Sequence, residues 1–313
     1  MIIKINEKDS SQRLDKFLTE RLKDLSRNQI QKLIKQSAVV VNNLPVSAHY
    51  NLQIGDKIAV KNINLAPVKK IEKKPAGKAP DIKVIKATAD YLVINKPAGL
   101  AVHGKNDFTL ADWLKTNYPK IKSVGDDPER PGIVHRLDKD VSGLMVIALN
   151  QKSFASLKKQ FQERNIIKEY IGLTHGQISK EYGLINFPIR RSADGYKMAA
   201  LPLTFRGAAS NAGREAITEF EVIKKLVNYT LLKIKIKTGR THQIRVHLAA
   251  YDHPLVGDNI YATAKTRIQN KKLGLGRVFL VADRLSFIDL TGDRQDFKIN
   301  LTLELKNLLK KVK

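Results

Sequence analysis

The first sixty residues have the pattern of two short helices followed by small strands. Residues 15–25 place apolar side chains on one helical face, and Ser26 is a suitable N-cap for a second helix over 27–36. Short strands are predicted at 39–41 and 57–60, each beside a turn. The helical residues predicted to face inward are Phe17, Leu18, Leu22, Leu25, Ile30, Leu33 and Ile34. These elements predict a small α/β module.

Residues 62–81 break this pattern with prolines and lysines, a composition that keeps a chain extended. We expect a basic, flexible linker that lets two domains find a partner separately, although an inert spacer has the same composition. The predicted organisation is therefore a module over 1–61, a linker over 62–81 and a larger domain over 82–313.

The larger domain alternates apolar runs typical of strands with helical patterns, but without a regular βαβ rhythm. Helices are predicted over 109–118, 153–165 and 243–251. Strands are predicted over 82–87, 90–97, 132–134, 144–149, 168–176, 220–239 (folded back at 227–228) and 279–290. We therefore predict an α+β fold with a mixed, mostly antiparallel β-sheet flanked by helices.

Charge is the unusual feature of the composition. The chain has 56 Lys and Arg against 30 Asp and Glu, a formal net charge of +26. Such an excess points to a polyanionic partner, with nucleic acid ahead of an anionic membrane surface or an acidic protein. The absence of cysteine excludes disulfides, thiolate zinc sites and cysteine nucleophiles. No segment approaches the roughly 20 apolar residues of a membrane span, and the first residues resemble no targeting peptide.

The segment 132–143, GIVHRLDKDVSG, places reactive side chains between two apolar runs. A charged tip between buried strands is where a scaffold presents groups to a ligand, although a merely solvated hairpin loop has the same pattern. Its candidate residues include His135, Arg136 and Asp138.

Three further segments carry candidate chemistry. Residues 93–104 contain a Pro- and Gly-rich loop, and Lys168 and Tyr170 share one face of a strand by alternation. A Gly turn at 237–240 leads into a segment rich in hydrogen-bond donors, which includes Arg240, His242, Gln243, Arg245 and His247.

The motifs of several enzyme classes are missing. The histidines lack HExxH spacing, no phosphate-binding GxxxxGK[ST] loop occurs, and Ser142 lacks the GxSxG context of a serine hydrolase. What remains is a carboxylate on a loop, an arginine-rich segment and a tyrosine. A carboxylate paired with arginine stays ionised and oriented, which suits attack or proton abstraction at a sugar carbon, and a tyrosine ring suits stacking on a base.

These segments, in order, resemble the motifs of the RluA family of pseudouridine synthases. The resemblance rests on NKPAGLAVHG, HRLDKDVSG, KEYIGLTHG and TGRTHQIRVHLAAYDHPLVGDNIY. The first module, with RLDKFL, SRNQIQKLIKQSAVVVNN and IGDKI, resembles a ribosomal-protein-S-four-like RNA-binding domain. A dimerisation or capping module is the alternative for that region. The chain departs from the family pattern at Val141, Ala262 and Val281, where Thr, Gly and His are usual.

The resemblance implies isomerisation of uridine to pseudouridine in folded RNA. Asp138 would be the catalytic carboxylate, Arg240 would pair with it, and Tyr170 would stack on the base and assist removal of the final proton. Arg136 would enter the RNA helix as the uridine leaves the stack. The other substrate-binding candidates are His135, Lys168, His242, Gln243 and Arg245. A purely structural hydrogen bond is as good a role for His135, and the last three are expected to contact phosphate or shape the loop rather than do chemistry. In the first module the RNA-binding candidates are Arg13, Arg27, Lys32 and Lys35.

Within the family, residues 95–104 and 273–287 resemble most closely the RluC type, which modifies large-subunit (23S) ribosomal RNA. Transfer RNA or another RNA is the alternative substrate, and a non-catalytic RNA-binding assembly factor is the alternative function. The reaction exchanges bonds without oxidation, so neither a metal nor an organic cofactor is expected. We expect a cytoplasmic monomer that binds ribosomal RNA and no membrane.

Overall fold

The computed structural model describes residues 1–22, 25, 27–60, 81–104, 107–192, 197–201 and 213–312. The chain forms two compact units, Met1–Glu72 and Lys73–Lys313, and each is described by itself. The predicted linker, 62–81, falls almost entirely outside the described residues.

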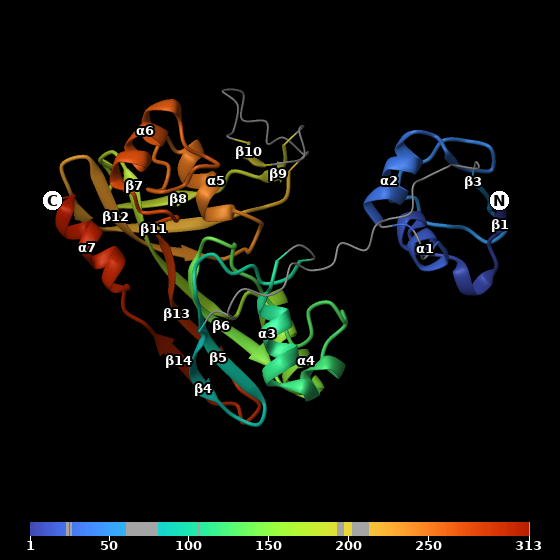
Figure 1. The fold of residues 1–313 in the computed structure, drawn as a ribbon, viewed down its shortest axis with the longest axis horizontal. Coiled ribbons are helices and arrows are strands. Elements are labelled where there is room, and N and C mark those ends of the chain that lie inside the picture. Colours follow the sequence, from blue (N-terminus) through green and yellow to red (C-terminus); the bar gives the residue numbers. More distant parts are fainter. Residues whose placement is uncertain are drawn as a thin grey trace. The chain divides into compact units, whose positions relative to one another are not determined.

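The N-terminal unit packs two helices against a three-stranded antiparallel sheet of order β1-β3-β2 (Figure 1). Its elements are β1 (Ile2–Lys4), the 3-10 turn η1 (Glu7–Asp9), α1 (Leu14–Arg21), α2 (Arg27–Lys35), β2 (Val39–Val41) and β3 (Lys57–Val60). The predicted inward faces are confirmed, because Phe17, Leu18, Ile30, Leu33 and Ile34 are buried, and Leu22 and Leu25 pack at the edge of this core. The first helix ends earlier than predicted, because the backbone of Leu22 leaves helical geometry. The proposed cap Ser26 lies outside the described residues.

The C-terminal unit is built on a nine-stranded, mostly antiparallel sheet. Its strand order is β4-β5-β6-β13-β7-β12-β11-β8, with β14 beside β13 and the β6–β13 pair parallel. The strands are β4 (Lys83–Ala87), β5 (Tyr91–Lys96), β6 (Ser142–Ala148), β7 (Ile167–His175), β8 (Tyr182–Ile185), β11 (Thr218–Lys225), β12 (Tyr229–Ile236), β13 (Leu280–Ile288) and β14 (Arg294–Lys298). A separate hairpin is formed by β9 (Ile189–Arg191) and β10 (Met198–Ala200).

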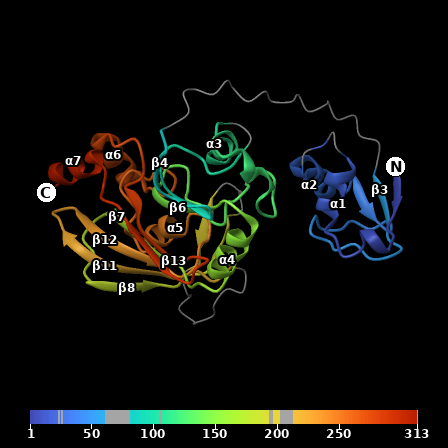
Figure 2. The same cartoon turned by 90° about the horizontal axis from the view of Figure 1, so that it is seen from below.

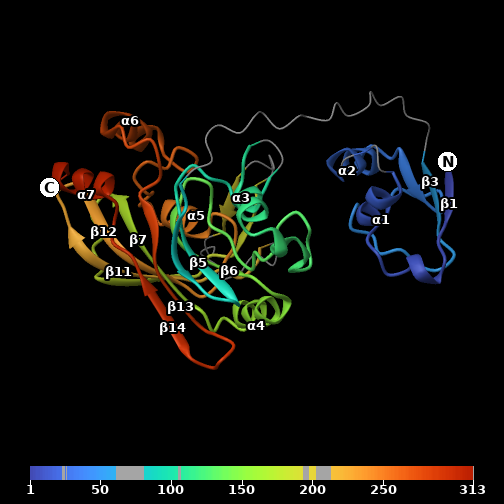
Figure 3. The same cartoon turned by 60° about the horizontal axis from the view of Figure 1, so that its bottom comes forward.

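Helices cover both ends of this sheet, with α3 and α4 beside β5 and β6 and with α5, α6 and α7 towards β7 and β12 (Figures 2 and 3). They are α3 (Leu110–Asn117), the 3-10 helix η2 (Pro119–Ser123), α4 (Gln151–Gln162), α5 (Gln243–Ala250), α6 (Ala264–Leu273) and α7 (Leu303–Lys311). Thr109 and Asp112 form a capping box at α3, which explains why that helix begins where the sequence predicts. Among the described residues, no helix is both long enough and apolar enough to cross a membrane.

The two faces of the sheet pack against different helices. Tyr170, Leu232 and Ile234 belong to the main core, which also contains Ile244 and Leu248 of α5. The opposite face is covered in part by α7, in a cluster that contains Leu173, Val281, Leu305 and Leu308. Val281, where the family usually has His, therefore adds an apolar side chain to this cluster.

The predicted α+β class is confirmed, including the reversal at Val227–Asn228, which lies between β11 and β12. The predicted strand at 132–134 is wrong. That segment makes one isolated bridge, Ile133 with Ile147, and otherwise runs as a loop that approaches β6. The pattern of three apolar residues was too short to distinguish a strand from a buried loop.

Candidate active site

Asp138 lies in the loop that enters β6, where β13 approaches β6 closely. A Cβ atom on Gly143 would lie 2.3 Å from the carbonyl oxygen of Ala282, and its φ is +131°. Only glycine therefore lets β13 approach β6 this closely, and the loop before it is fixed by that contact.

Lys96 holds the same loop from the other side. Its side chain is 0% exposed, and its ammonium donates to the carbonyl oxygens of Pro97, Leu100 and Lys139 at 2.9, 2.8 and 3.2 Å. The amide of Gly99 also donates to the Lys139 oxygen at 2.8 Å. Burial, with the nearby charge of Arg277, lowers the pKa of Lys96 to about 7. Lys96 thus fastens the 93–104 loop to the residue that follows Asp138.

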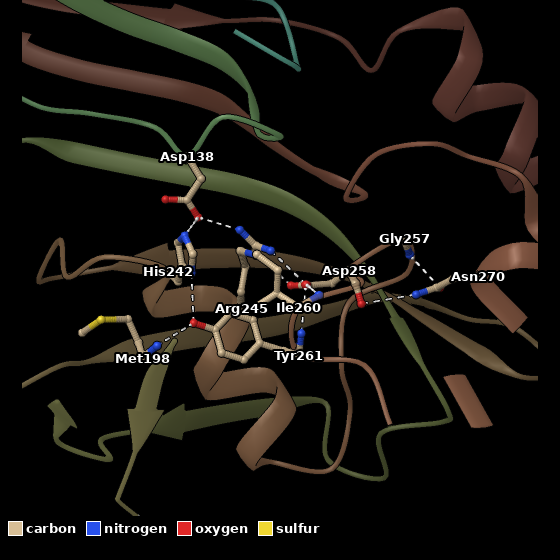
Figure 4. A network of polar contacts seen from close by, with 9 residues as sticks. All are labelled: Asp138, Met198, His242, Arg245, Gly257, Asp258, Ile260, Tyr261 and Asn270. Atoms are coloured by element: carbon tan, nitrogen blue, oxygen red, sulfur yellow. Dashed lines mark hydrogen bonds and ion pairs between the residues drawn. The ribbon is translucent and has the colours of Figure 1, made fainter. Parts of the chain in front are cut away.

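Arg245 joins Asp138 to a second, fully buried carboxylate (Figure 4). Its guanidinium contacts Asp258 twice, at 2.7 and 2.9 Å, and Asp138 Oδ2 at 3.4 Å. Arg245 is 3% exposed, Asp258 0% and Asp138 15%. Burial alone would lower the pKa of Arg245, but hydrogen bonds and charge from Asp258, with help from Asp138, raise it above its usual value. The aspartate is therefore presented to a cavity with a permanent cation behind it.

His242 approaches Asp138 from the turn before α5, with Nε2 4.0 Å from Oδ2. Its Nδ1 lies 2.9 Å from the hydroxyl of Tyr261, which accepts the amide N–H of Met198 at 3.1 Å (Figure 4). The arrangement that satisfies every group has Tyr261 donating to Nδ1, so Nε2 carries the hydrogen that faces Asp138. Burial lowers the pKa of His242, Arg245 and Arg136 lower it further, and the charges of Asp138 and Asp258 oppose this effect.

The predicted pairing of Arg240 with Asp138 is wrong, because Arg245 occupies that position. The side chain of Arg240 donates through Nε to the carbonyl oxygen of Glu215 at 3.0 Å, and its amide donates to Gln243. His242 has a left-handed backbone, φ 54° and ψ 22°, which turns the chain between Arg240 and the helix that carries Arg245.

Gln243 and Arg245, expected to contact phosphate or shape the loop, are both buried at the start of α5, and both line the smaller cavity described below. Gln243 accepts from Thr238 and Arg240 and donates to Ile217 and Thr218. Its hydrogen-bonding capacity is therefore used within the fold. His247 is also enclosed, between Thr218 and the carbonyl oxygen of Phe187.

Two adjoining cavities open beside Asp138. The smaller, about 70 Å³, is lined by Asp138, Val141, Tyr170, His242 and Arg245 among others. The larger, about 440 Å³, is lined by His135, Arg136, Lys168 and Arg240 among others, and it shares Arg136, Tyr170 and Arg240 with its neighbour. The loop, β7, the turn before α5 and the start of α5 thus bring the predicted residues of the catalytic unit together around the two cavities, Gln243 among them.

Tyr170 is buried rather than exposed, and only its cavity-facing side is open to a ligand. Burial, and then the charge of Asp138, raises the pKa of its phenol above the usual value, so it stays protonated at neutral pH. His135 accepts the Val146 amide N–H at Nε2, 3.1 Å, and stacks on Phe161 with ring centroids 4.6 Å apart. Burial lowers the pKa of His135 to about 3, which is consistent with a structural role for a neutral imidazole.

The RNA-binding candidates of the N-terminal unit differ in their availability. Lys32 and Lys35 are exposed on α2. Arg13, predicted to face outward, is bound to the buried Asp15 at 2.9 and 3.1 Å. The side chain of Arg27 lies outside the described residues.

Sequence reasoning missed Lys96, Asp258 and Tyr261 as supports of the site. All three lie within the quoted motif segments, but nothing in their spacing indicates that they act on Asp138. Across the described part of the chain, no three His, Cys, Asp or Glu side chains form a group that could hold a metal ion.

Comparison with known proteins assigns this arrangement to a class. Residues 90–250 match the RNA pseudouridylate synthase family, and residues 12–58 match the S4 domain. An Aquifex aeolicus protein named "Uncharacterized RNA pseudouridine synthase" is 38% identical over 95% of this chain and 93% of its own length. A Vibrio parahaemolyticus protein named "Ribosomal large subunit pseudouridine synthase C" is 30% identical over 97% and 93%. The solved human "RNA Pseudouridylate Synthase Domain Containing 4" has a TM-score of 0.60 and 25% identity, and the match covers 73% of this chain and 92% of that chain.

The chain therefore belongs to the RNA pseudouridylate synthase family, and its N-terminal unit contains an S4 domain. It is an RNA pseudouridine synthase, an enzyme that converts uridine in RNA to pseudouridine.

Proposed function

We propose that Asp138 is the catalytic carboxylate and that the substrate is a uridine of large-subunit ribosomal RNA. The observation that carries the first part is the lining of the two cavities, in which Asp138 is the sole carboxylate among the described residues. A carboxylate held against a buried arginine and open to a cavity is suited to act on a ribose carbon.

The reaction replaces the C1′–N1 bond between ribose and uracil with a C1′–C5 bond. In one route Asp138 attacks C1′ of the ribose and forms an ester-like bond as the C1′–N1 bond breaks and uracil leaves as an anion. The uracil turns over, C5 attacks C1′, and the carboxylate is released. In the other route Asp138 removes the C2′ proton as the C1′–N1 bond breaks, which gives a glycal and a uracil anion. C5 of the turned uracil then bonds to C1′ and the proton returns to C2′. Both routes end with loss of the C5 proton, and a substrate deuterated at C2′ distinguishes them, because only the second predicts a primary isotope effect.

The neighbours of Asp138 have separate roles in this proposal. Arg245 holds the carboxylate in one orientation through its contact at 3.4 Å, and the Nε2–H of His242 faces the same carboxylate. Tyr170 contacts the uracil ring, while its high pKa argues against removal of the final proton by a phenolate. Arg136, exposed at the junction of both cavities, enters the space that the uridine leaves in the RNA.

The substrate assignment is supported by the name of the Vibrio relative and by the resemblance to the RluC type. We propose that the chain acts as a cytoplasmic monomer, with an RNA-binding module over 1–61, a linker over 62–81 and a catalytic domain over 82–313. The S4 match at 12–58 and the synthase match at 90–250 support these limits.

Pseudouridine mapping by carbodiimide labelling and primer extension tests the proposal in cells that lack the protein. Loss of large-subunit sites that wild type restores and Asp138→Asn does not restore supports both parts. If the ribosomal map is unchanged and transfer RNA sites are lost, transfer RNA replaces ribosomal RNA as the proposed substrate. Restoration by Asp138→Asn rejects the catalytic role.

A further inference from the structure

The larger cavity beside the aspartate is lined by cations. Its wall carries six basic side chains and no acidic one: Arg130, Arg136, Arg164, Lys168, Lys237 and Arg240. Three of the six pair with carboxylates that do not line the cavity, namely Arg130 with Asp127, Arg164 with Glu215 and Lys237 with Glu219. The charged side chains that line the cavity are therefore all of the sign that attracts an anion.

Among the cations of this wall without a carboxylate partner, Lys168 has the least favourable environment. It lies on β7 on the same face as Tyr170, with Nζ 5.3 Å from the centroid of the Phe161 ring. No carboxylate of the described residues forms an ion pair with it. Burial lowers the pKa of its ammonium to about 8, and no neighbouring charge offsets this effect. A desolvated cation without a counter-ion destabilises a fold, which is the cost expected of a group kept for a ligand.

The space next to Lys168 is kept open by the backbone. A Cβ atom added to Gly239 would come 3.8 Å from Nζ, so the absence of a side chain there leaves the ammonium accessible from the Thr238–Arg240 turn. Arg240 in this turn is held by the carbonyl oxygen of Glu215 at 3.0 Å, which fixes a second cation on the same wall.

The side chains that line the larger cavity determine which part of a nucleotide it can bind. Lysine and arginine side chains only donate hydrogen bonds, whereas a phosphodiester only accepts them. Uracil has two acceptor oxygens but also an N3–H donor, and the six cations offer that donor no acceptor. The smaller cavity, with Asp138, His242 and Tyr170, has the mixed polarity suited to the reacting sugar and base.

We propose that the larger cavity is a phosphate subsite, in which Lys168 binds a phosphodiester that flanks the target uridine while the sugar of that uridine faces Asp138. This inference rests on the proposed function, because it takes RNA as the ligand and Asp138 as the reaction centre. Lys168 is a substrate-binding residue in this account and takes no part in bond exchange.

Acetylation of Lys168 in the full-length protein tests the subsite directly. The probe is uridine 3′,5′-bisphosphate, with unphosphorylated uridine at the same millimolar concentration for comparison, and labelling is read by mass spectrometry. We expect the bisphosphate to slow acetylation of Lys168 about 10-fold and uridine to leave it unchanged, since a charge-assisted contact covers the amine. Lys152, exposed on α4, is the internal control and should label equally in every sample.

Substitutions extend the test. Lys168→Met should weaken binding of the bisphosphate about 10-fold in titration calorimetry without weakening binding of uridine, and Lys168→Arg should restore most of the loss. The Met variant should unfold at the same or a higher temperature, because a half-buried charge without an ion-pair partner is removed, whereas loss of a structural lysine would leave the protein less stable.

Unchanged labelling of Lys168, no binding of the bisphosphate, or equal binding by Lys168→Met would each overturn the subsite. These outcomes differ from failure of the proposed function. If Asp138→Asn still makes pseudouridine, the catalytic assignment fails whatever happens at Lys168. If pseudouridine depends on Asp138 but the bisphosphate does not protect Lys168, only the subsite fails.

Discussion

Replacing Arg245 by Met should destabilise the catalytic unit strongly, because it strips two carboxylates of one shared cation. Arg245 and Asp258 are 3% and 0% exposed and are joined at 2.7 and 2.9 Å. Removing one partner of such a buried pair leaves an uncompensated charge and costs about 3–5 kcal/mol. At roughly 2–4 °C per kcal/mol for a domain of this size, the melting temperature should fall by about 6–20 °C.

Arg284→Met is the matched control for this prediction. Arg284 also makes a close pair, with Asp296 at 2.6 Å, but the two side chains are 33% and 42% exposed. Its longer contact, to Glu169 at 3.5 Å, can be lost without leaving that carboxylate alone, because Lys233 pairs with Glu169 at 3.2 Å. Solvent screening limits the contribution of such a pair to about 0–1 kcal/mol. Thermal unfolding of both variants, followed by calorimetry at one pH and salt concentration, compares the same substitution at a buried ion pair and at a partly exposed one.

Asp258→Asn refines the comparison. It should cost less than Arg245→Met, since the amide oxygen can still accept from the N–H groups of Ile260 and Tyr261, and Arg245 retains Asp138. Equal shifts for Arg245→Met and Arg284→Met would refute the reasoning, because they would show that burial does not determine the cost at this site.

Three further predictions concern the groups around Asp138. Tyr261→Phe removes the hydroxyl that orients His242, and we expect about a 10-fold loss of turnover while the free energy of unfolding falls by no more than about 2 kcal/mol. Unchanged turnover would contradict the chain of contacts from Tyr261 through His242 to Asp138. The folded pKa of Lys96, about 7, lies below that of an unfolded lysine, so the unfolded state binds more protons and stability should rise above pH 7. Lys96→Met should abolish that rise, which urea unfolding at several pH values measures. The folded pKa of His135, about 3, likewise predicts stability lost as pH falls from about 6.5 towards 3, and a His135→Leu variant with an identical pH profile would refute it.

The sequence predicted the location of the site better than its internal pairing. Alternation along one strand placed Lys168 and Tyr170 on one face, and both line the larger cavity. The sequence could not show that Arg245 rather than Arg240 contacts Asp138. Both arginines lie in one short segment, and the left-handed backbone at His242 decides which of them faces Asp138.

Other supports of the site depend on contacts far apart in the sequence. Lys96 reaches the carbonyl oxygen of Lys139, and Asp258 reaches Arg245 from beyond the end of α5. Helical and strand periodicity carry no information on such pairs. The amphipathic helix α7 was also missed, although its buried Leu305 and Leu308 complete the far face of the sheet.

Release of tritium from an RNA labelled at C5 of uridine tests the central claim most directly, because every conversion to pseudouridine frees one C5 hydrogen. Full-length wild type, Asp138→Asn and Asp140→Asn are compared on a large-subunit ribosomal RNA transcript, with Asp140 as the neighbouring acid of the same loop. We predict release by wild type and Asp140→Asn, and a loss of at least about 1,000-fold in Asp138→Asn with RNA binding retained. Release by Asp138→Asn at a rate near that of wild type would contradict the account.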